Sequence, residues 1–135
     1  QQQKIDHAEA LMRKALDEAP NNPLILRSLC ELLRQQGRVA QAIGFGHKAV
    51  ELAPQDEIAQ LNLAVALTDN KDWDQAIYHY HRLLELSPNH VQAWLSLAVL
   101  LLQQNRKADA HAALEAVLLL EPGNAQAIAF KQSLL

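Results

Sequence analysis

Proline recurs in this sequence at a fixed interval. Pro20, Pro54, Pro88 and Pro122 follow one another in steps of 34 residues. Each follows a stretch with the apolar pattern of a helix, which proline cannot continue because it lacks an N–H and crowds the preceding turn. Regular helix breaks of this kind predict a repeated unit rather than one irregular globule.

A second helix break lies midway between successive prolines, at 36–38, 70–72 and 104–106. Gly and Asn in these breaks suit a left-handed residue that closes a helix. Each unit is therefore expected to be two antiparallel helices of roughly three to four turns. The expected first helices are 23–36, 57–69, 91–104 and 125–135, and the expected second helices are 4–19, 39–53, 73–87 and 107–120.

The composition favours an all-helical protein. Of 135 residues, 50% are hydrophobic and only 4% aromatic, and Thr68 is the single threonine, so strand formers are few and disorder is disfavoured. A formal net charge of −3 argues against a nucleic-acid binder, which needs a surplus of Lys and Arg. The longest apolar stretch, 97–102, is far shorter than the roughly 20 residues that cross a membrane.

At the level of single positions, the unit resembles the tetratricopeptide repeat (TPR) family, which has this length and helical-hairpin form. The family pattern is a large residue, Leu followed by a small residue, another large residue, and later Ala, an aromatic residue, Ala and Pro. The clearest copy is Trp94, Leu97-Ala98, Leu101, Ala110, Leu114, Val117 and Pro122. The copy before it is Leu63-Ala64, Leu67, Trp73, Ala76, Tyr80, Leu83 and Pro88, with Gln60 in the large opening slot.

The resemblance covers essentially the whole chain and implies an all-α fold, a right-handed α-solenoid of antiparallel helix hairpins. It makes residues 1–135 a single array, with half a repeat at 1–22, full repeats at 23–56, 57–90 and 91–124, and a capping C-terminal helix at 125–135. We expect the native protein to supply one more helix upstream, because the helix at 4–19 lacks its partner.

Two small residues within this pattern predict how the helices pack around them. Cys30, the single cysteine, falls in a small slot and is expected to be a buried, inert spacer. Gly46 falls inside a helix, in the slot that Tyr80 holds one unit later, so a notch beside Phe45 is expected. The notch is either a functional cleft or a place of local repacking, and repacking is favoured.

In TPR proteins the first helices line a concave groove where ligands commonly bind. Helical spacing opposite the core face selects the groove residues here, which are Arg27, Glu31, Arg34, Ile58, Leu61, Asn62, Val65, Asp69, Leu95, Ser96, Val99 and Leu102. Its apolar members are expected to form one strip, a usual sign of an interaction site, with Arg27, Arg34 and Asp69 setting the direction of a bound peptide. The alternative is that supertwist or neighbouring chains bury the strip.

Other kinds of site are poorly supported. The carboxylate clamp of chaperone-binding TPR domains maps to Arg27, Glu31, Asn62, Gln92 and Ser96, of which only Arg27 and Asn62 fit. The six histidines lack Cys, Asp or Glu partners at ligand spacing and are interpreted as solvated on the outer face. No catalytic residue, cofactor or metal site is therefore predicted.

The sequence thus predicts a non-catalytic protein-protein interaction module for a peptide or protein partner with an apolar or amphipathic segment. It predicts neither nucleic-acid binding nor membrane insertion. Two alternatives stay open: a substrate-recruiting or regulatory arm of a larger enzyme such as a transferase, and a scaffold that forms a homo-oligomer through exposed repeat ends. With one cysteine and no internal disulfide, the compartment is undetermined, and a soluble cytoplasmic chain is favoured.

Overall fold

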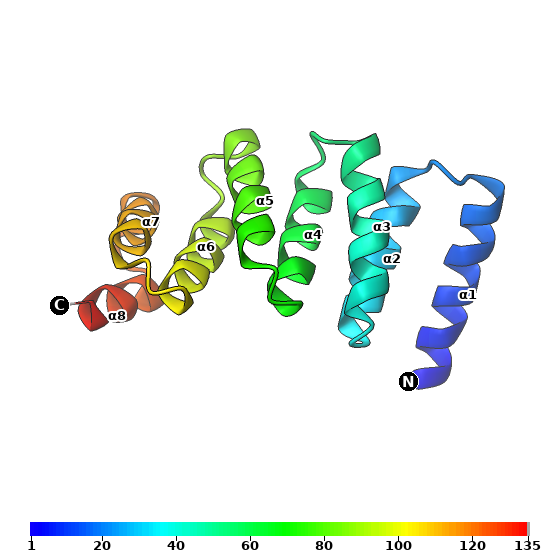
Figure 1. Ribbon diagram of the computed structural model, residues 1–135, viewed down its shortest axis with the longest axis horizontal. Coiled ribbons are helices and arrows are strands. Elements are labelled where there is room, and N and C mark those ends of the chain that lie inside the picture. Colours follow the sequence, from blue (N-terminus) through cyan, green and yellow to red (C-terminus); the bar gives the residue numbers. More distant parts are fainter. Residues whose placement is uncertain (135) are drawn as a thin grey trace. The chain divides into compact units, whose positions relative to one another are not determined.

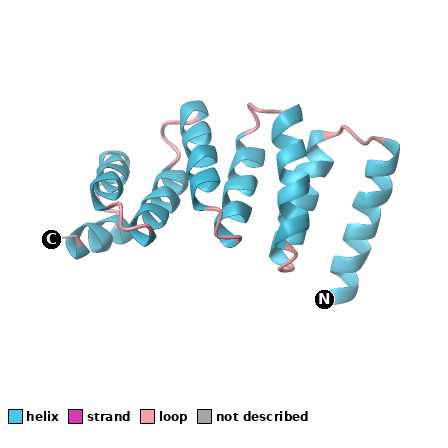
Figure 2. Cartoon of the chain, viewed as in Figure 1, coloured by secondary structure: helices cyan, strands magenta, loops and turns pink. Residues whose placement is uncertain are grey.

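The computed structural model describes residues 1–134, and all regular structure in this range is α-helical (Figures 1 and 2). The described helices are α1 (Gln2–Glu18), α2 (Pro23–Gln35), α3 (Val39–Leu52), α4 (Glu57–Asp69), α5 (Trp73–Leu86), α6 (Val91–Gln103), α7 (Lys107–Leu120) and α8 (Ala125–Ser133). Every helix begins and ends within two residues of the expected one. The expected last helix also included residue 135, which lies outside the described residues.

A side-chain cap starts each first helix two residues after the repeated proline. The caps are Asn22, Asp56, His90 and Asn124, whose side chains accept hydrogen bonds from backbone N–H groups of the first turn. Such caps satisfy donors that would otherwise lack a partner within the helix. His90 accepts through Nδ1, 3.1 Å from the N of Ala93, so this half-buried histidine has a structural role that the solvated interpretation missed.

A left-handed residue ends each of the three first helices that lead into a tight turn. Gly37, Lys71 and Asn105 have φ angles of +78°, +63° and +57°, again 34 residues apart. The helix breaks expected midway between the prolines are therefore confirmed. Lys71 is the costly member of this set, because a left-handed backbone brings its Cβ close to the following carbonyl oxygen.

The chain divides into two compact units, Gln1–His79 and Tyr80–Leu135, with the division inside α5. In the first unit, α2 packs against α1, α3 and α4, and consecutive helices lie side by side (Figure 1). Its core is built on fully buried leucines from α2 and α4, which are Leu26, Leu29, Leu33, Leu63 and Leu67.

In the second unit, α7 packs against both α6 and α8. Its core cluster combines small and large side chains, which are Leu95, Ala98, Ala113, Leu114, Val117 and Ala127. At the surface, Lys131 of α8 forms an ion pair with Glu115 of α7. The hydrogen bond from Lys131 holds the pKa of the Glu115 carboxyl below its usual value.

Gly46 marks a close approach between helices rather than a notch. It is buried, and a Cβ atom at this position would lie 3.0 Å from Cys30 Sγ in α2 and 3.0 Å from Leu63 Cδ1 in α4. The neighbouring side chains have therefore filled the space that a larger residue would take. Local repacking is confirmed, and the alternative of a functional cleft is wrong.

Candidate functional site

The groove residues predicted for the first unit lie on α2 and α4. On α4, Ile58 is 49% exposed, and Leu61 and Val65 are half-buried. Positions three and seven residues apart share one side of a helix, so these three side chains form a short apolar strip. The strip is the part of the predicted apolar surface that remains accessible to solvent in the first unit.

Two arginines near this strip are each paired with an aspartate. Arg27 Nη1 lies 2.6 Å from Asp56 Oδ2. Arg34 Nη1 lies 3.6 Å from Asp69 Oδ2, so two of the side chains expected to orient a peptide bind each other. Sequence reasoning missed Asp56, although its place next to the repeated proline marked it as a helix cap.

Two further members of the predicted groove set are polar. The Nδ2 of Asn62 donates to the backbone carbonyl of Arg27 at 3.4 Å, a long and therefore weak hydrogen bond. Glu31 is exposed and accepts from Gln35 Nε2 at 3.4 Å. An exposed carboxylate beside an already paired Arg27 makes this face unfavourable for an anionic ligand.

The predicted groove residues of the second unit differ in how far they are buried. Ser96, Val99 and Leu102 are half-buried on α6, where Ser96 Oγ accepts a hydrogen bond from Gln92 Nε2 at 3.3 Å. Leu95 is only 7% exposed and belongs to the core cluster. Leu95 is therefore a core residue and not a surface residue of the predicted groove.

Leu95 is buried in a cluster to which both α7 and α8 contribute. Ala127 of α8 is part of the same cluster, and Phe130 and Leu134 pack against it. One sequence signal was available, because the expected C-terminal helix must bury an apolar side on its neighbours. Helical spacing within α6 alone did not indicate this burial.

Cys30 is a spacer beneath the α2 face. Its side chain is fully buried, and burial raises the pKa of the thiol to about 11. Since the thiolate is the reactive form of cysteine, the Cys30 thiol stays protonated and unreactive near neutral pH. The expectation of a buried spacer is confirmed.

A buried polar pair lies in the first unit, where no site was expected. Gln60 is 1% exposed, and its Nε2 donates to the backbone carbonyl of Pro54 at 2.9 Å. The remaining amide oxygen of Gln60 lies 2.9 Å from Nδ1 of His79, which is 8% exposed. An amide oxygen only accepts, so His79 carries its proton on Nδ1 and donates.

His79 therefore corrects the interpretation that all six histidines are solvated. Its ring also meets the ring of His47 edge-on, with the two centroids 5.9 Å apart. The sequence did carry a signal, because Gln60 occupies a slot that is large and apolar in the repeat pattern. A polar side chain in such a slot needs a buried partner.

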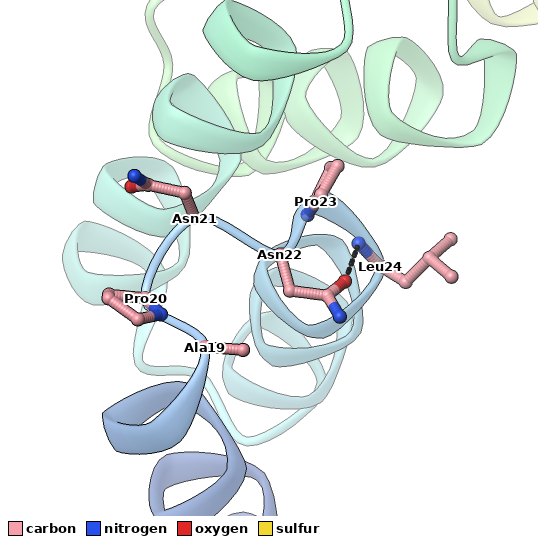
Figure 3. A pocket seen from close by; sticks show the side chains of 6 residues that line it. All are labelled: Ala19, Pro20, Asn21, Asn22, Pro23 and Leu24. Carbon is pink, nitrogen blue, oxygen red and sulfur yellow. Dashed lines mark hydrogen bonds between the residues drawn. The ribbon is translucent and has the colours of Figure 1, made fainter.

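A recess also lies in the turn between α1 and α2 (Figure 3). It has a volume of about 570 Å³ and is lined by Ala19, Pro20, Asn21, Asn22, Pro23 and Leu24. The amide oxygen of Asn22 already accepts from the N–H of Leu24 at 3.0 Å, as Figure 3 shows. The recess follows from the proline-rich turn, and its lining contains no charged side chain.

The tetratricopeptide repeat family matches residues 1–61 and 67–134 of the chain. The protein therefore belongs to the tetratricopeptide repeat family, whose members in general serve protein interactions rather than catalysis. No curated protein sequence matches the chain. Among the described residues, none of the helices is both long enough and apolar enough to cross a membrane.

Solved structures of TPR proteins share the fold of this chain. MamA is 22% identical, with a TM-score of 0.93 over 98% of this chain and 78% of MamA. YrrB, a TPR protein with an unusual peptide-binding site, is 21% identical, with a TM-score of 0.87 over 97% of this chain and 68% of YrrB. The first TPR of Spaghetti (RPAP3), bound to the HSP90 peptide SRMEEVD, is 21% identical, with a TM-score of 0.76 over 83% of this chain and 89% of that one.

At such identities the likeness shows the fold alone. It confirms the predicted fold class, an α-solenoid of antiparallel helix hairpins.

Proposed function

We propose that this protein is a non-catalytic interaction module that binds an apolar or amphipathic peptide segment on the faces of its first helices. The observation that carries the proposal is the strip on α4, where Ile58 is 49% exposed beside the half-buried Leu61 and Val65. A partner that covers a row of exposed apolar side chains removes them from water, and this burial favours binding. In the second unit, Val99 and Leu102 offer the same chemistry on α6.

The paired charges narrow the class of peptide. Arg27 is engaged by Asp56, and Glu31 is exposed nearby, so a ligand carboxylate would meet no free arginine and one repelling charge. An acidic segment such as the peptide bound to the RPAP3 repeat therefore fits this face poorly. A segment with apolar side chains on one side fits better, because its affinity would come from burial rather than from ion pairing.

The test begins with a random-peptide display selection on the whole chain, followed by calorimetric titration of one selected peptide. Val65→Asp and Val99→Asp are expected to leave helicity unchanged, and at least one of them is expected to weaken binding tenfold or more. Ala40→Asp and Ala108→Asp, at exposed positions of α3 and α7, are the matched controls. Binding that survives both valine substitutions, or that the alanine controls weaken equally, contradicts the proposal.

Self-assembly is a second candidate that specific side chains favour. Leu119 of α7 is 83% exposed, and Leu120 beside it is 37% exposed. A second copy of the chain that covers this end would remove both leucines from water. Light scattering over a concentration series tests this candidate. A mass that stays monomeric, or association that survives Leu119→Ser, contradicts it.

A further inference from the structure

A cavity of about 250 Å³ lies in the second unit, away from the proposed peptide face. Its described lining is His81, Trp94, Leu97, Leu101, Arg106, Asp109, Ala112 and Ala113. Trp94, Leu97 and Leu101 lie on one side of α6 by helical spacing, opposite the side that carries Ser96 and Val99. The cavity is therefore distinct from the face invoked above.

Two residues that line the cavity differ from their counterparts in the preceding repeat. The residues 34 positions before Ala112 and Ala113 are Tyr78 and His79, so two rings of the preceding repeat are replaced by two methyl groups. In the first unit the His79 ring is held by a hydrogen bond to Gln60 and by an edge-on contact with the His47 ring. In the second unit the Ala113 methyl group stands at the position of this ring and lines the cavity.

Two walls of the cavity come from positions that also surround His79 in the first unit. His47 corresponds to His81, and Gln60 corresponds to Trp94, and both of these counterparts line the cavity. The indole N–H of Trp94 donates to the carbonyl of Pro88 at 2.8 Å, as the amide of Gln60 does to Pro54 at 2.9 Å. This hydrogen bond holds the Trp94 indole in position as one wall of the cavity.

The depth and rim of the cavity indicate what would fill it. The floor is apolar, with Leu97 1% and Leu101 3% exposed. The exposed His81 ring at the rim supplies a nitrogen that can hydrogen-bond a hydroxyl group. A cavity of about 150 Å³ already accommodates benzene in another protein, so this one is large enough for one substituted ring.

The charges at the mouth favour a ring carried by a polypeptide. Arg106 and Asp109 lie there as an exposed pair, with Nη2 and Oδ2 2.9 Å apart. Their side chains are 48% and 58% exposed, unlike those of the more buried Arg27–Asp56 pair, and an exposed ion pair contributes little to stability. Arg106 and Asp109 can therefore exchange each other for the C=O and N–H groups that flank a residue in a peptide. A free aromatic ring has neither of these backbone groups and would not engage the pair.

We propose that this cavity receives a tyrosine side chain of a partner polypeptide, with the ring on Trp94 and the hydroxyl group at His81. The site is independent of the proposed peptide face, because it uses the opposite side of α6. Ala112 and Ala113, which replace the two rings of the preceding repeat, would leave room for the tyrosine ring.

The test uses N-acetyl-tyrosinamide as the probe and the indole N–H signals of Trp73 and Trp94 as readouts in NMR titration. The chain has only these two tryptophans, and Trp73→Phe assigns the signals. The Trp94 signal is expected to shift saturably at roughly millimolar probe, a usual affinity for so small a ligand. N-acetyl-leucinamide is expected to shift it at least fivefold less, and the Trp73 signal is expected to stay in place.

The decisive variant is Ala112→Tyr/Ala113→His, which restores the residues of the preceding repeat and fills the cavity. It is expected to abolish the Trp94 shift, and Ala108→Tyr, at an exposed position of the same helix, is expected to keep it. If the double variant does not fold, Ala113→Leu blocks the same space with one change.

Several results would overturn the proposal. They are equal shifts with the tyrosine and leucine probes, equal shifts of both tryptophans, and a Trp94 shift that persists in the filled variant. Self-association that both the filled variant and Tyr78→Ala abolish would replace the partner with a second copy of this chain, whose Tyr78 is 59% exposed.

Discussion

The amide oxygen of Gln60 lies 2.9 Å from Nδ1 of His79, and both side chains are buried between α4 and α5. The same glutamine donates to the carbonyl of Pro54, so it joins the repeated proline turn to the next helix pair. The next repeat has Trp94 in place of Gln60 and Ala113 in place of His79. The same two positions of the repeat therefore hold a hydrogen-bonded polar pair in one repeat and an indole beside a cavity in the next.

Gln60→Leu is expected to lower the free energy of unfolding by about 2 kcal/mol, because the buried His79 loses its hydrogen bond to Gln60 and the Pro54 carbonyl loses the bond from the Gln60 amide. Urea denaturation followed by circular dichroism measures the change. Gln75→Leu is the control, at an exposed position of α5. Equal stability of the two variants would show that the buried bonds contribute nothing.

The two glycines of α3 form a matched pair. A Cβ at Gly44 would meet nothing within 4 Å, whereas a Cβ at Gly46 would meet Cys30 and Leu63 at 3.0 Å. Gly44→Ala is expected to stabilise the protein by about 1 kcal/mol through helix propensity alone. Gly46→Ala is expected to destabilise it by about 1–3 kcal/mol through overpacking.

Thermal denaturation compares the two glycine variants directly. Adding Cys30→Ala to Gly46→Ala removes one of the two close contacts, so part of the lost stability is expected to return. No recovery in the double variant would contradict the assigned contact between Gly46 and Cys30.

Lys71→Gly is expected to raise the free energy of unfolding by about 1 kcal/mol, because glycine adopts the φ of +63° without the clash of a Cβ atom. Asn105→Gly is the comparison, since asparagine tolerates the left-handed region better than lysine does. The gain at position 105 is therefore expected to be smaller. Chemical denaturation of both variants measures the difference, and an equal or reversed order would contradict the strain at Lys71.

Glu9 joins α1 to the start of α3. Its carboxylate oxygens lie 2.7 Å from Arg13 Nε and 2.6 Å from Arg38 Nη1. Hydrogen bonds from Arg13 and Arg38 hold the pKa of Glu9 below its usual value. Ionised Glu9 therefore stabilises the folded chain above the unfolded pKa near 4.5, and this contribution disappears as pH falls through the lowered pKa.

Glu9→Gln is accordingly expected to lower stability at pH 7 by about 1 kcal/mol, because both arginines are partly exposed. The difference from the parent chain should vanish in acid. Hydrogen exchange of α1 amides across this pH range measures it, and Glu51→Gln provides an exposed control on α3. A difference that persists in acid would show that the charge of Glu9 is not its cause.

The sequence alone determined the features that depend on short-range chemistry. The repeated prolines, the left-handed turn residues and the apolar periodicity placed every helix boundary within two residues. These signals are local, because a missing N–H or a positive φ acts on the backbone of its own turn. The family assignment follows from the same spacing.

The tertiary structure alone decided which side chains remain available. Leu95 has the helical phase of a surface residue, but it belongs to a cluster with residues of α7 and α8 and is buried. By sequence Arg27 is free to bind a ligand, but in the structure it is paired with Asp56, which lies 29 positions later in the chain. Burial and ion pairing depend on atoms brought together from distant positions, and helical periodicity records only which side of its own helix a residue occupies.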